Sequence, residues 1–65
     1  MNITEREQDI LKLLIRGKTN KEIARELDIS RHTVRDHVSS LLRKRGATTR
    51  TELVSRHIKN TEGHD

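Results

Sequence analysis

The pattern Thr-x-x-Glu occurs three times in this chain of 65 residues, each time before apolar residues at helical spacing. The three copies are Thr4–Glu7, Thr19–Glu22 and Thr49–Glu52. This pattern is the capping box, in which the threonine hydroxyl and the glutamate carboxylate each accept a hydrogen bond from a backbone amide at the helix start. Ser30 can cap a further helix with its hydroxyl alone. These four start signals constrain the chain to a set of short helices.

Two glycines mark the ends of predicted helices. Gly17 and Gly46 each follow an apolar repeat and suit the left-handed residue that ends many helices. The start and stop signals together predict an all-α fold of four helices, at about residues 4–16, 20–27, 30–45 and 50–59. One domain would span residues 1–60, and we expect residues 61–65 to form a disordered tail because no apolar side chain anchors them.

Apolar side chains recur at helical spacing in every predicted helix, so each helix can turn one face to a common core. Burial of each large side chain contributes roughly 1.5–3 kcal/mol, which predicts a small domain of modest stability. The predicted core residues are Ile3, Ile10, Leu11, Leu13, Leu14, Ile15, Ile23, Ala24, Leu27, Ile29, Val34, Val38, Leu41, Leu42, Leu53, Val54 and Ile58.

Missing residue types exclude several classes of function. The chain has no Cys for a disulfide or a thiolate zinc site, and no Phe, Tyr or Trp on which unpaired bases could stack. No apolar run approaches the ~20 residues of a membrane span. So few apolar side chains can hardly enclose a catalytic pocket, and a third ligand beside His32 and Asp36 is not evident. We therefore expect no enzyme activity, no cofactor, no metal and no membrane partner.

The excess positive charge is confined to one stretch. The net charge of the chain is +4, and residues 1–29 and 46–65 are each balanced in charge. Residues 30–45 carry five basic side chains against one acidic side chain, Asp36. A basic patch of this kind is typical of a surface that binds a polyanion, although a solvated helix face has the same composition.

The second and third predicted helices are separated only by Asp28 and Ile29. Helices joined by so short a turn cross at a steep angle and form a helix-turn-helix unit, here at about residues 20–39. Many such units have Gly where Asp28 stands, and Asp tolerates the left-handed conformation better than most residues. Ala24 suits the point of closest approach between the two helices, because a larger side chain would push them apart.

On a helical wheel at ~100° per residue, the predicted third helix has an apolar arc and an opposite polar face. The polar face mixes donors and acceptors, as reading base edges in a major groove requires. A polar flank beside it offers hydroxyl, imidazole and ammonium donors for phosphates. The polar face contains His32, Arg35, Asp36, Ser39 and Arg43, and the flank contains Thr33, His37, Ser40 and Lys44.

A long series of residues at fixed offsets matches a known family. The matching residues are Ile3–Glu7, Ile10–Leu14, Gly17, Thr19–Ala24, Leu27, Ile29–Ser30, Thr33–Arg35, His37, Leu41, Lys44, Gly46–Ala47 and Arg50–Glu52. In these residues the chain resembles the LuxR/GerE-type helix-turn-helix domain of bacterial transcription regulators. The resemblance implies a cytoplasmic protein whose third helix enters the major groove of double-stranded DNA, often as a dimer through the fourth helix.

The resemblance also implies roles for individual residues. The implied base contacts are Arg35, Asp36 and Ser39. The implied phosphate contacts are Thr19, Lys21, Thr33, His37 and Lys44. The wheel and the start of the third helix add Arg31 and His32 as base contacts, and we expect Arg43 to contact phosphate.

Two positions depart from the family's pattern. Asp36 stands where neutral or basic side chains are common, so it either weakens nonspecific phosphate binding or is neutralised by neighbouring Arg35. Arg45 stands where the family usually has Leu, and the wheel places it in the apolar arc. Either its stem reaches past the core to solvent, or the third helix ends before it.

The predicted fourth helix offers a surface for a homodimer. The predicted interface residues are Leu53, Val54, His57 and Ile58. The apolar members of this set could instead pack in the core against the first helix, and the sequence leaves both interpretations open. A regulator that activates transcription would also need a surface for RNA polymerase.

A second class of function remains open. The chain could be a protein-interaction module that pairs with a related regulator through the fourth helix and inhibits it. The lack of a recognisable control region beside the domain favours this alternative. Met1 directly precedes the motif, which suits both a complete protein and the C-terminal domain of a longer one.

Overall fold

The computed structural model describes residues 2–62, with side chains up to residue 58, and contains four helices. They are α1 (Glu5–Ile15), α2 (Asn20–Leu27), α3 (Arg31–Arg45) and α4 (Arg50–Glu62). The all-α fold is confirmed, and the first three helices end within one residue of their predicted bounds. Helix α4 continues to Glu62, three residues past its predicted end. The remainder of the predicted tail, residues 63–65, lies outside the described residues.

The helix starts form as the capping pattern predicts. At α1, Glu7 N donates to Thr4 Oγ1 (3.1 Å) and Thr4 N donates to Glu7 Oε1 (3.0 Å). The box at the start of α2 is equally complete. At α3 the Ser30 hydroxyl accepts from Thr33 N (3.1 Å).

The third box is shifted by one residue. Glu52 N donates to Thr49 Oγ1 (3.1 Å), as expected. The Glu52 carboxylate, however, accepts from Thr48 N (3.0 Å) instead of Thr49 N. The side chain thus satisfies the amide one residue before the cap and fixes the start of α4 equally well.

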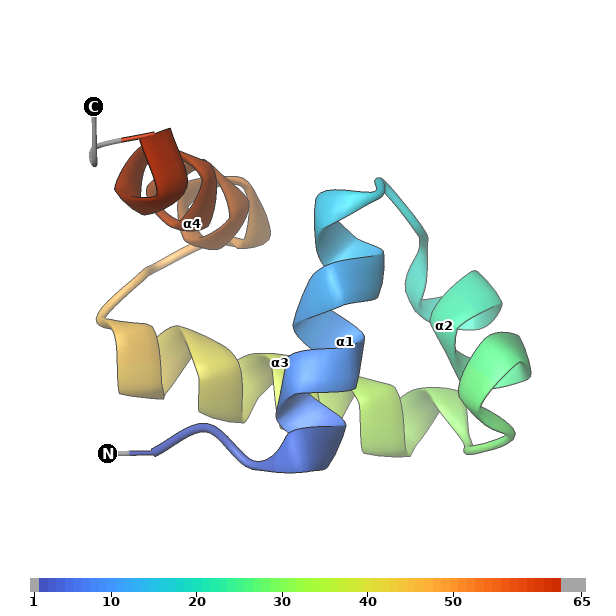
Figure 1. The fold of residues 1–65 in the computed structure, drawn as a ribbon. Coiled ribbons are helices and arrows are strands. Elements are labelled where there is room, and N and C mark those ends of the chain that lie inside the picture. The colour runs from blue at the N-terminus through green and yellow to red at the C-terminus, as the bar shows by residue number, and fades with distance from the viewer. Residues whose placement is uncertain (1, 63–65) are drawn as a thin grey trace.

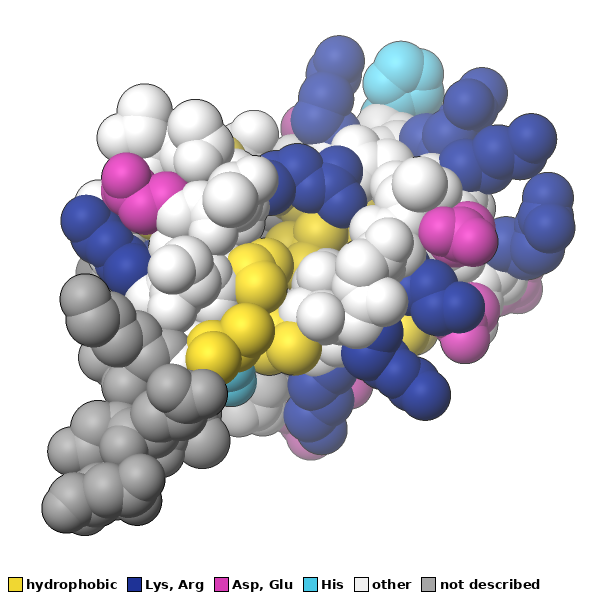
Figure 2. Space-filling model, turned by 90° about the horizontal axis from the view of Figure 1, so that it is seen from above, with side chains coloured by type: hydrophobic (Ala, Val, Ile, Leu, Met, Phe, Trp, Pro, Cys, Tyr) yellow, Lys and Arg dark blue, Asp and Glu magenta, His cyan; other side chains and the backbone are white. Residues whose placement is uncertain are grey.

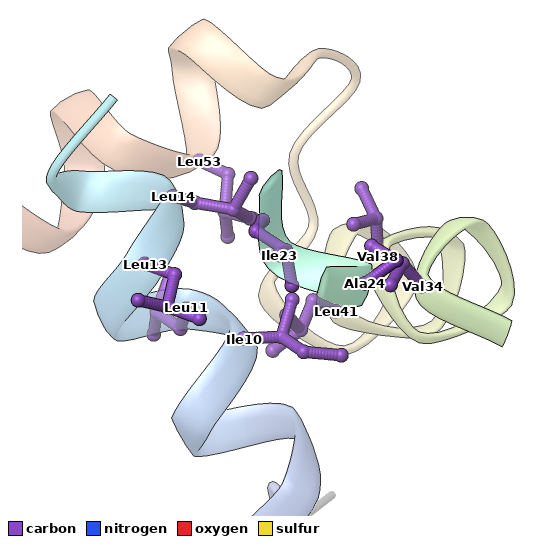
Figure 3. Packing of buried hydrophobic residues seen from close by; sticks show 10 residues of the cluster. All are labelled: Ile10, Leu11, Leu13, Leu14, Ile23, Ala24, Val34, Val38, Leu41 and Leu53. Atoms are coloured by element: carbon purple, nitrogen blue, oxygen red, sulfur yellow. The ribbon is translucent and has the colours of Figure 1, made fainter. Parts of the chain in front are cut away.

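The connection between α2 and α3 is the predicted helix-turn-helix turn. Asp28 is left-handed (φ 55°, ψ 47°), and Ile29 N donates to Ala24 O (3.0 Å), which closes the end of α2. Gly46 ends α3 in the same conformation (φ 67°). Ala24 lies beside Val34 and Val38 of α3, as the predicted close approach requires (Figure 3).

Figure 1 shows α1 crossing in front of α3, with α2 at one end of α3 and α4 above the other. The four helices share one apolar core, to which α1 contributes the largest group of side chains. The buried core residues are Ile10, Leu11, Leu13, Leu14, Ile23, Ala24, Val34, Val38, Leu41 and Leu53, drawn in Figure 3. All ten belong to the predicted core.

Two predictions for α4 need correction or refinement. Leu53 is 1% exposed and points toward Leu14 in Figure 3, so it belongs to the core and the prediction that it forms a dimer interface is wrong. Ile58 is 42% exposed, so it lies largely outside the core in which the apolar pattern placed it. The two side chains differ because Leu53, in the first turn of α4, packs in the core, whereas Ile58, more than one turn later, lies largely outside it.

Helix α3 continues through Arg45, so the alternative that it ends earlier is wrong. The Arg45 side chain is exposed and lines a small hollow with Leu11 and Leu53. Its position in the apolar arc is therefore accommodated by a stem that passes the edge of the core and reaches solvent.

Candidate nucleic-acid interface

Helix α3 turns one face inward and leaves the other free. Val34, Val38 and Leu41 are buried, and the residues half a turn away from them are exposed. The exposed residues of α3 include all five predicted base contacts and two further arginines; they are Arg31, His32, Arg35, Asp36, Ser39, Arg43 and Arg45. The predicted polar face is therefore confirmed as a solvent-accessible surface. A helix with such a face has the dimensions and the donor and acceptor groups that a major groove admits.

Asp36 keeps its charge free on this face. Among the described residues, no ion pair joins Asp36 to Arg35 or to another cation. The alternative that Arg35 neutralises Asp36 is therefore wrong. Both side chains are available in the free protein, one as a donor and one as an acceptor.

A polar groove of about 690 Å³ brings together the starts of α2, α3 and α4. Backbone amides at helix starts, together with the dipoles of the helices, favour anions at such a place. The groove is lined by Thr19, Asn20, Lys21, Ser30, Arg31, His32, Arg35 and Arg50. Two predicted phosphate contacts from α2 thus lie in one groove with three predicted base contacts from α3.

The other predicted phosphate contacts lie along α3. The Thr33 side chain is half-buried, and its hydroxyl shares a hydrogen bond with Ser30 Oγ (2.9 Å). His37 is half-buried and Arg43 is exposed. These three residues therefore remain near the surface, and none of them has the ion pair that Lys44 makes.

Lys44 is engaged by partners from the start of the chain. Its ammonium donates to Glu7 Oε1 (2.7 Å) and to Asn2 O (3.0 Å). The side chains of Lys44 and Glu7 are only 17% and 5% exposed. In the free protein the charge of Lys44, a predicted phosphate contact, is therefore paired with a carboxylate.

The hydrogen bond from Lys44 is also the main reason that the pKa of Glu7 falls from 4.5 to about 2. Hydrogen bonds from Ser40 and from the Thr4 backbone lower the pKa of Glu7 further, against the opposing effect of burial. Sequence reasoning identified Glu7 only as a capping residue. The one sequence feature that indicates a second role is that Glu7 lies on the same face of α1 as the apolar residues.

Arg50 lines the groove but has no role in the prediction from the sequence. Its guanidinium donates to Asn20 Oδ1 (2.6 Å) through Nη1 and to Lys18 O (3.1 Å) through Nη2. The start of α4 is thereby fastened to the turn before α2. No local pattern signals this contact, because the partners are thirty residues apart in the sequence.

A second, apolar hollow of about 720 Å³ lies between the end of α1 and α4. Figure 2 shows its yellow floor, with Lys and Arg side chains at the edges. Leu14, Ile15, Val54 and Ile58 supply its apolar lining. Of the predicted dimer residues, Val54 and His57 are half-buried and Ile58 is exposed, so these three remain near the surface of α4.

Within residues 2–62, none of the helices combines the length and the apolar character that crossing a bilayer demands.

Comparison with known proteins agrees with this architecture. Residues 1–57 match the family described as bacterial regulatory proteins, luxR family. Among similar proteins, the spore germination protein GerE of Bacillus subtilis is 46% identical over 52 residues, which cover 80% of this chain and 70% of GerE. The nitrate/nitrite response regulator protein NarL of Escherichia coli is 50% identical over 50 residues, covering 77% of this chain.

The transcriptional regulatory protein DesR of B. subtilis is 43% identical over 54 residues, covering 83% of this chain. The matched segments are only 23% of NarL and 27% of DesR, so this chain corresponds to about a quarter of those relatives. The family match covers the helix-turn-helix unit, its exposed α3 face and the start of α4. The chain therefore belongs to the luxR family of bacterial regulatory proteins, as the helix-turn-helix domain of a DNA-binding transcription regulator.

Proposed function

We propose that this domain reads a specific sequence of double-stranded DNA with α3 in the major groove. The observation that supports the proposal is the exposed face of α3, where arginine, histidine, aspartate and serine stand together beside a groove rich in cations. Each base pair presents its own pattern of hydrogen-bond donors and acceptors in the major groove, so a helix face that offers both donors and acceptors can distinguish base pairs. The base contacts in this proposal are Arg31, His32, Arg35, Asp36 and Ser39.

Phosphate contacts on both sides of α3 would hold the helix in register. Helix α2 supplies Thr19 and Lys21, and α3 supplies Thr33, His37 and Arg43. Contacts to the DNA backbone position a protein without conveying sequence, so these residues would contribute equally on any duplex. Lys44 has no part in this set, because its ammonium is paired with Glu7.

Two copies of the domain are proposed to bind together. A single module buries about 600–1,000 Å² of protein surface on DNA, which gives weak binding by itself. Val54, His57 and Ile58 on α4 would form the contact between copies. Two copies on a two-fold site would place their α3 helices about 10–10.5 base pairs apart. Such a dimer would act in the cytoplasm, where duplex DNA lies in a bacterium, and an activator would also meet RNA polymerase there.

One observation favours a second candidate function. The apolar hollow beside Ile58 could receive a related regulator, which this domain would inhibit by pairing with it. Titration of labelled duplex DNA at several salt concentrations separates the two candidates. A DNA-binding domain shows a logarithm of affinity that falls linearly with the logarithm of salt concentration, whereas an inhibitor binds little DNA alone.

Selection of bound duplexes from random-sequence DNA then tests sequence reading directly. We expect the selected duplexes to share a two-fold symmetric site. Enrichment of no common sequence, despite salt-dependent binding, would contradict base reading by α3 and leave only nonspecific binding.

A further inference from the structure

The Arg50 guanidinium bridges two elements at the edge of the polar groove. Its two terminal nitrogens donate to the Asn20 side chain (2.6 Å) and to the Lys18 carbonyl (3.1 Å). These acceptors lie immediately before and after Thr19. Both ends of the turn that begins α2 are therefore held by a single side chain from α4.

The segment that Arg50 holds has few other anchors outside α2 itself. Thr19 and Lys21 are exposed, and Lys18 and Asn20 are half-buried. The capping box links Thr19 only to Glu22, within the same helix. Lys18 N donates to Leu13 O (3.1 Å), which ties the turn to α1 but not to α3 or α4. Ile23 and Ala24 pack the body of α2 in the core, and Arg50 adds the hydrogen bonds that tie the residues on either side of Thr19 to α4.

We propose that Arg50 is a positioning residue for DNA binding, which sets Thr19 and Lys21 at the distance from α3 that a phosphate of the bound duplex requires. The inference rests on the proposed function and adds a residue of α4 to it. Arg50 acts through its two acceptors, and it fastens the helix proposed to pair two copies to the turn that meets the DNA backbone.

The chemistry of the contact explains why arginine is needed. A guanidinium is a flat fork that reaches two acceptors in fixed directions, whereas the lysine ammonium is a point charge on a flexible stem. An Arg50→Lys variant keeps the charge of the groove but cannot hold both acceptors in this geometry. The variant therefore separates positioning from simple attraction to phosphate.

A double-mutant cycle between Arg50 and Lys21 tests the proposal. The probe is a fluorescein-labelled duplex of mixed sequence, with affinities measured by anisotropy for the wild type, Arg50→Lys, Lys21→Ala and the double variant. We expect Arg50→Lys to weaken binding about fivefold to tenfold, as loss of one hydrogen bond of ordinary net strength does. Lys21→Ala should weaken binding about fivefold in the wild type and less than about twofold in the Arg50→Lys background, because Lys21 is then already misplaced.

Arg56→Lys is the matched control. Arg56 lies on the same helix, carries the same charge and also donates to backbone carbonyls of another element, those of Arg45 (3.0 Å) and Gly46 (2.7 Å). It lines the small hollow near Leu11 and not the polar groove. The losses from Arg56→Lys and Lys21→Ala should therefore multiply, as they do for independent sites.

A measurement without DNA completes the test. Amide hydrogen exchange followed by NMR should be faster at Thr19–Glu22 in Arg50→Lys than in the wild type, with unchanged exchange in α3. If Arg50→Lys does not fold, Asn20→Ala takes its place, because it removes one acceptor and leaves the arginine.

The outcomes are distinct. Losses that multiply for Arg50→Lys and Lys21→Ala, or unchanged exchange at Thr19–Glu22, would overturn the positioning role while leaving the proposed function standing. A wild-type domain that binds no duplex at any salt concentration would overturn both.

Discussion

Helices α1 to α3 and helix α4 are held in the molecule by different forces. The first three helices supply nine of the ten buried apolar side chains, and α4 supplies Leu53 alone. In return, α4 contributes two arginines that reach across to other elements, Arg50 to the turn before α2 and Arg56 to the end of α3. The α1–α3 body is thus an apolar assembly, whereas α4 is joined to it by buried Leu53, partly buried Val54 and the hydrogen bonds of two arginines.

This difference matches the work that each region is proposed to do. A helix that reads base edges must be held rigidly, and close apolar packing provides a single well-defined arrangement. A helix that meets a second copy must keep apolar surface free, as Ile58 and the hollow beside it do. Burying all of α4 would stabilise the domain and remove the surface that another copy could use.

The largest expected effect compares the two regions of the core. Leu41→Ala, in the body, should cost about 3–4 kcal/mol, and Leu53→Ala, in α4, about 2–3 kcal/mol. Leu41 is enclosed by the body, whereas Leu53 borders a hollow of about 230 Å³ into which neighbours and water can move. Urea unfolding of both variants measures the difference. An equal or greater loss for Leu53→Ala would show that α4 is as firmly packed as the body.

The two ion pairs allow a second comparison. Glu7 and Lys44 form a buried pair in the body, and Glu52 and Arg56 form an exposed pair on α4 (3.4 Å, side chains 40% and 51% exposed). Glu7→Gln should cost about 2 kcal/mol at neutral pH, because it leaves the Lys44 ammonium buried without its charge partner. Glu52→Gln should change stability by less than about 0.5 kcal/mol.

The pH dependence of unfolding in acid measures the contribution of the Glu7 carboxylate to stability. Its folded-state pKa is lowered, so the unfolded chain takes up the proton at a higher pH than the folded chain. The stabilisation is complete above pH 4.5 and is lost as the pH falls through about 2. Unfolding measured across this range should be less steeply pH-dependent for Glu7→Gln. Part of the slope will remain in both proteins, because the hydrogen bonds from Thr19 also lower the pKa of Glu22. Identical slopes would contradict the buried pair.

Substitutions on the exposed surface of the α1–α3 body should change DNA binding without changing the free energy of unfolding. Arg35→Ala should weaken binding to a selected duplex by about 1–3 kcal/mol and relax preference at one base pair. Lys21→Ala should weaken binding to selected and random duplexes alike, because a phosphate contact carries no sequence information. Competition binding with both duplexes tests this, and equal losses from both variants on both duplexes would refute the division of roles.

The smallest effect on stability is expected at the exposed face of α4. Ile58→Ser should change the free energy of unfolding by no more than about 0.5 kcal/mol, since the side chain is largely outside the core. It should nevertheless prevent two copies from binding a two-fold site together, as measured by the stoichiometry of the complex. If two copies of this variant still bind the site together, Ile58 is not part of the dimer contact.

Local signals predicted most of the fold. Start and stop residues act within one helical turn of themselves, so the caps of the first three helices and the left-handed turn at Asp28 follow from their own neighbours in the sequence. The shifted cap at Glu52 differs because adjacent amides at a helix start compete for one carboxylate, and local pattern does not rank them.

The four helices, the apolar face of each and the exposed face of α3 could be predicted from the sequence, because periodicity and capping depend on residues only a few positions apart. Which charges remain free depends instead on how the helices pack against one another. Lys44 is paired with Glu7, and Arg50 reaches Asn20 and Lys18, in each case across at least thirty residues of the sequence. The position of α4 also separated buried Leu53 from exposed Ile58. Charge pairing and burial depend on distances in space, which helical periodicity does not specify.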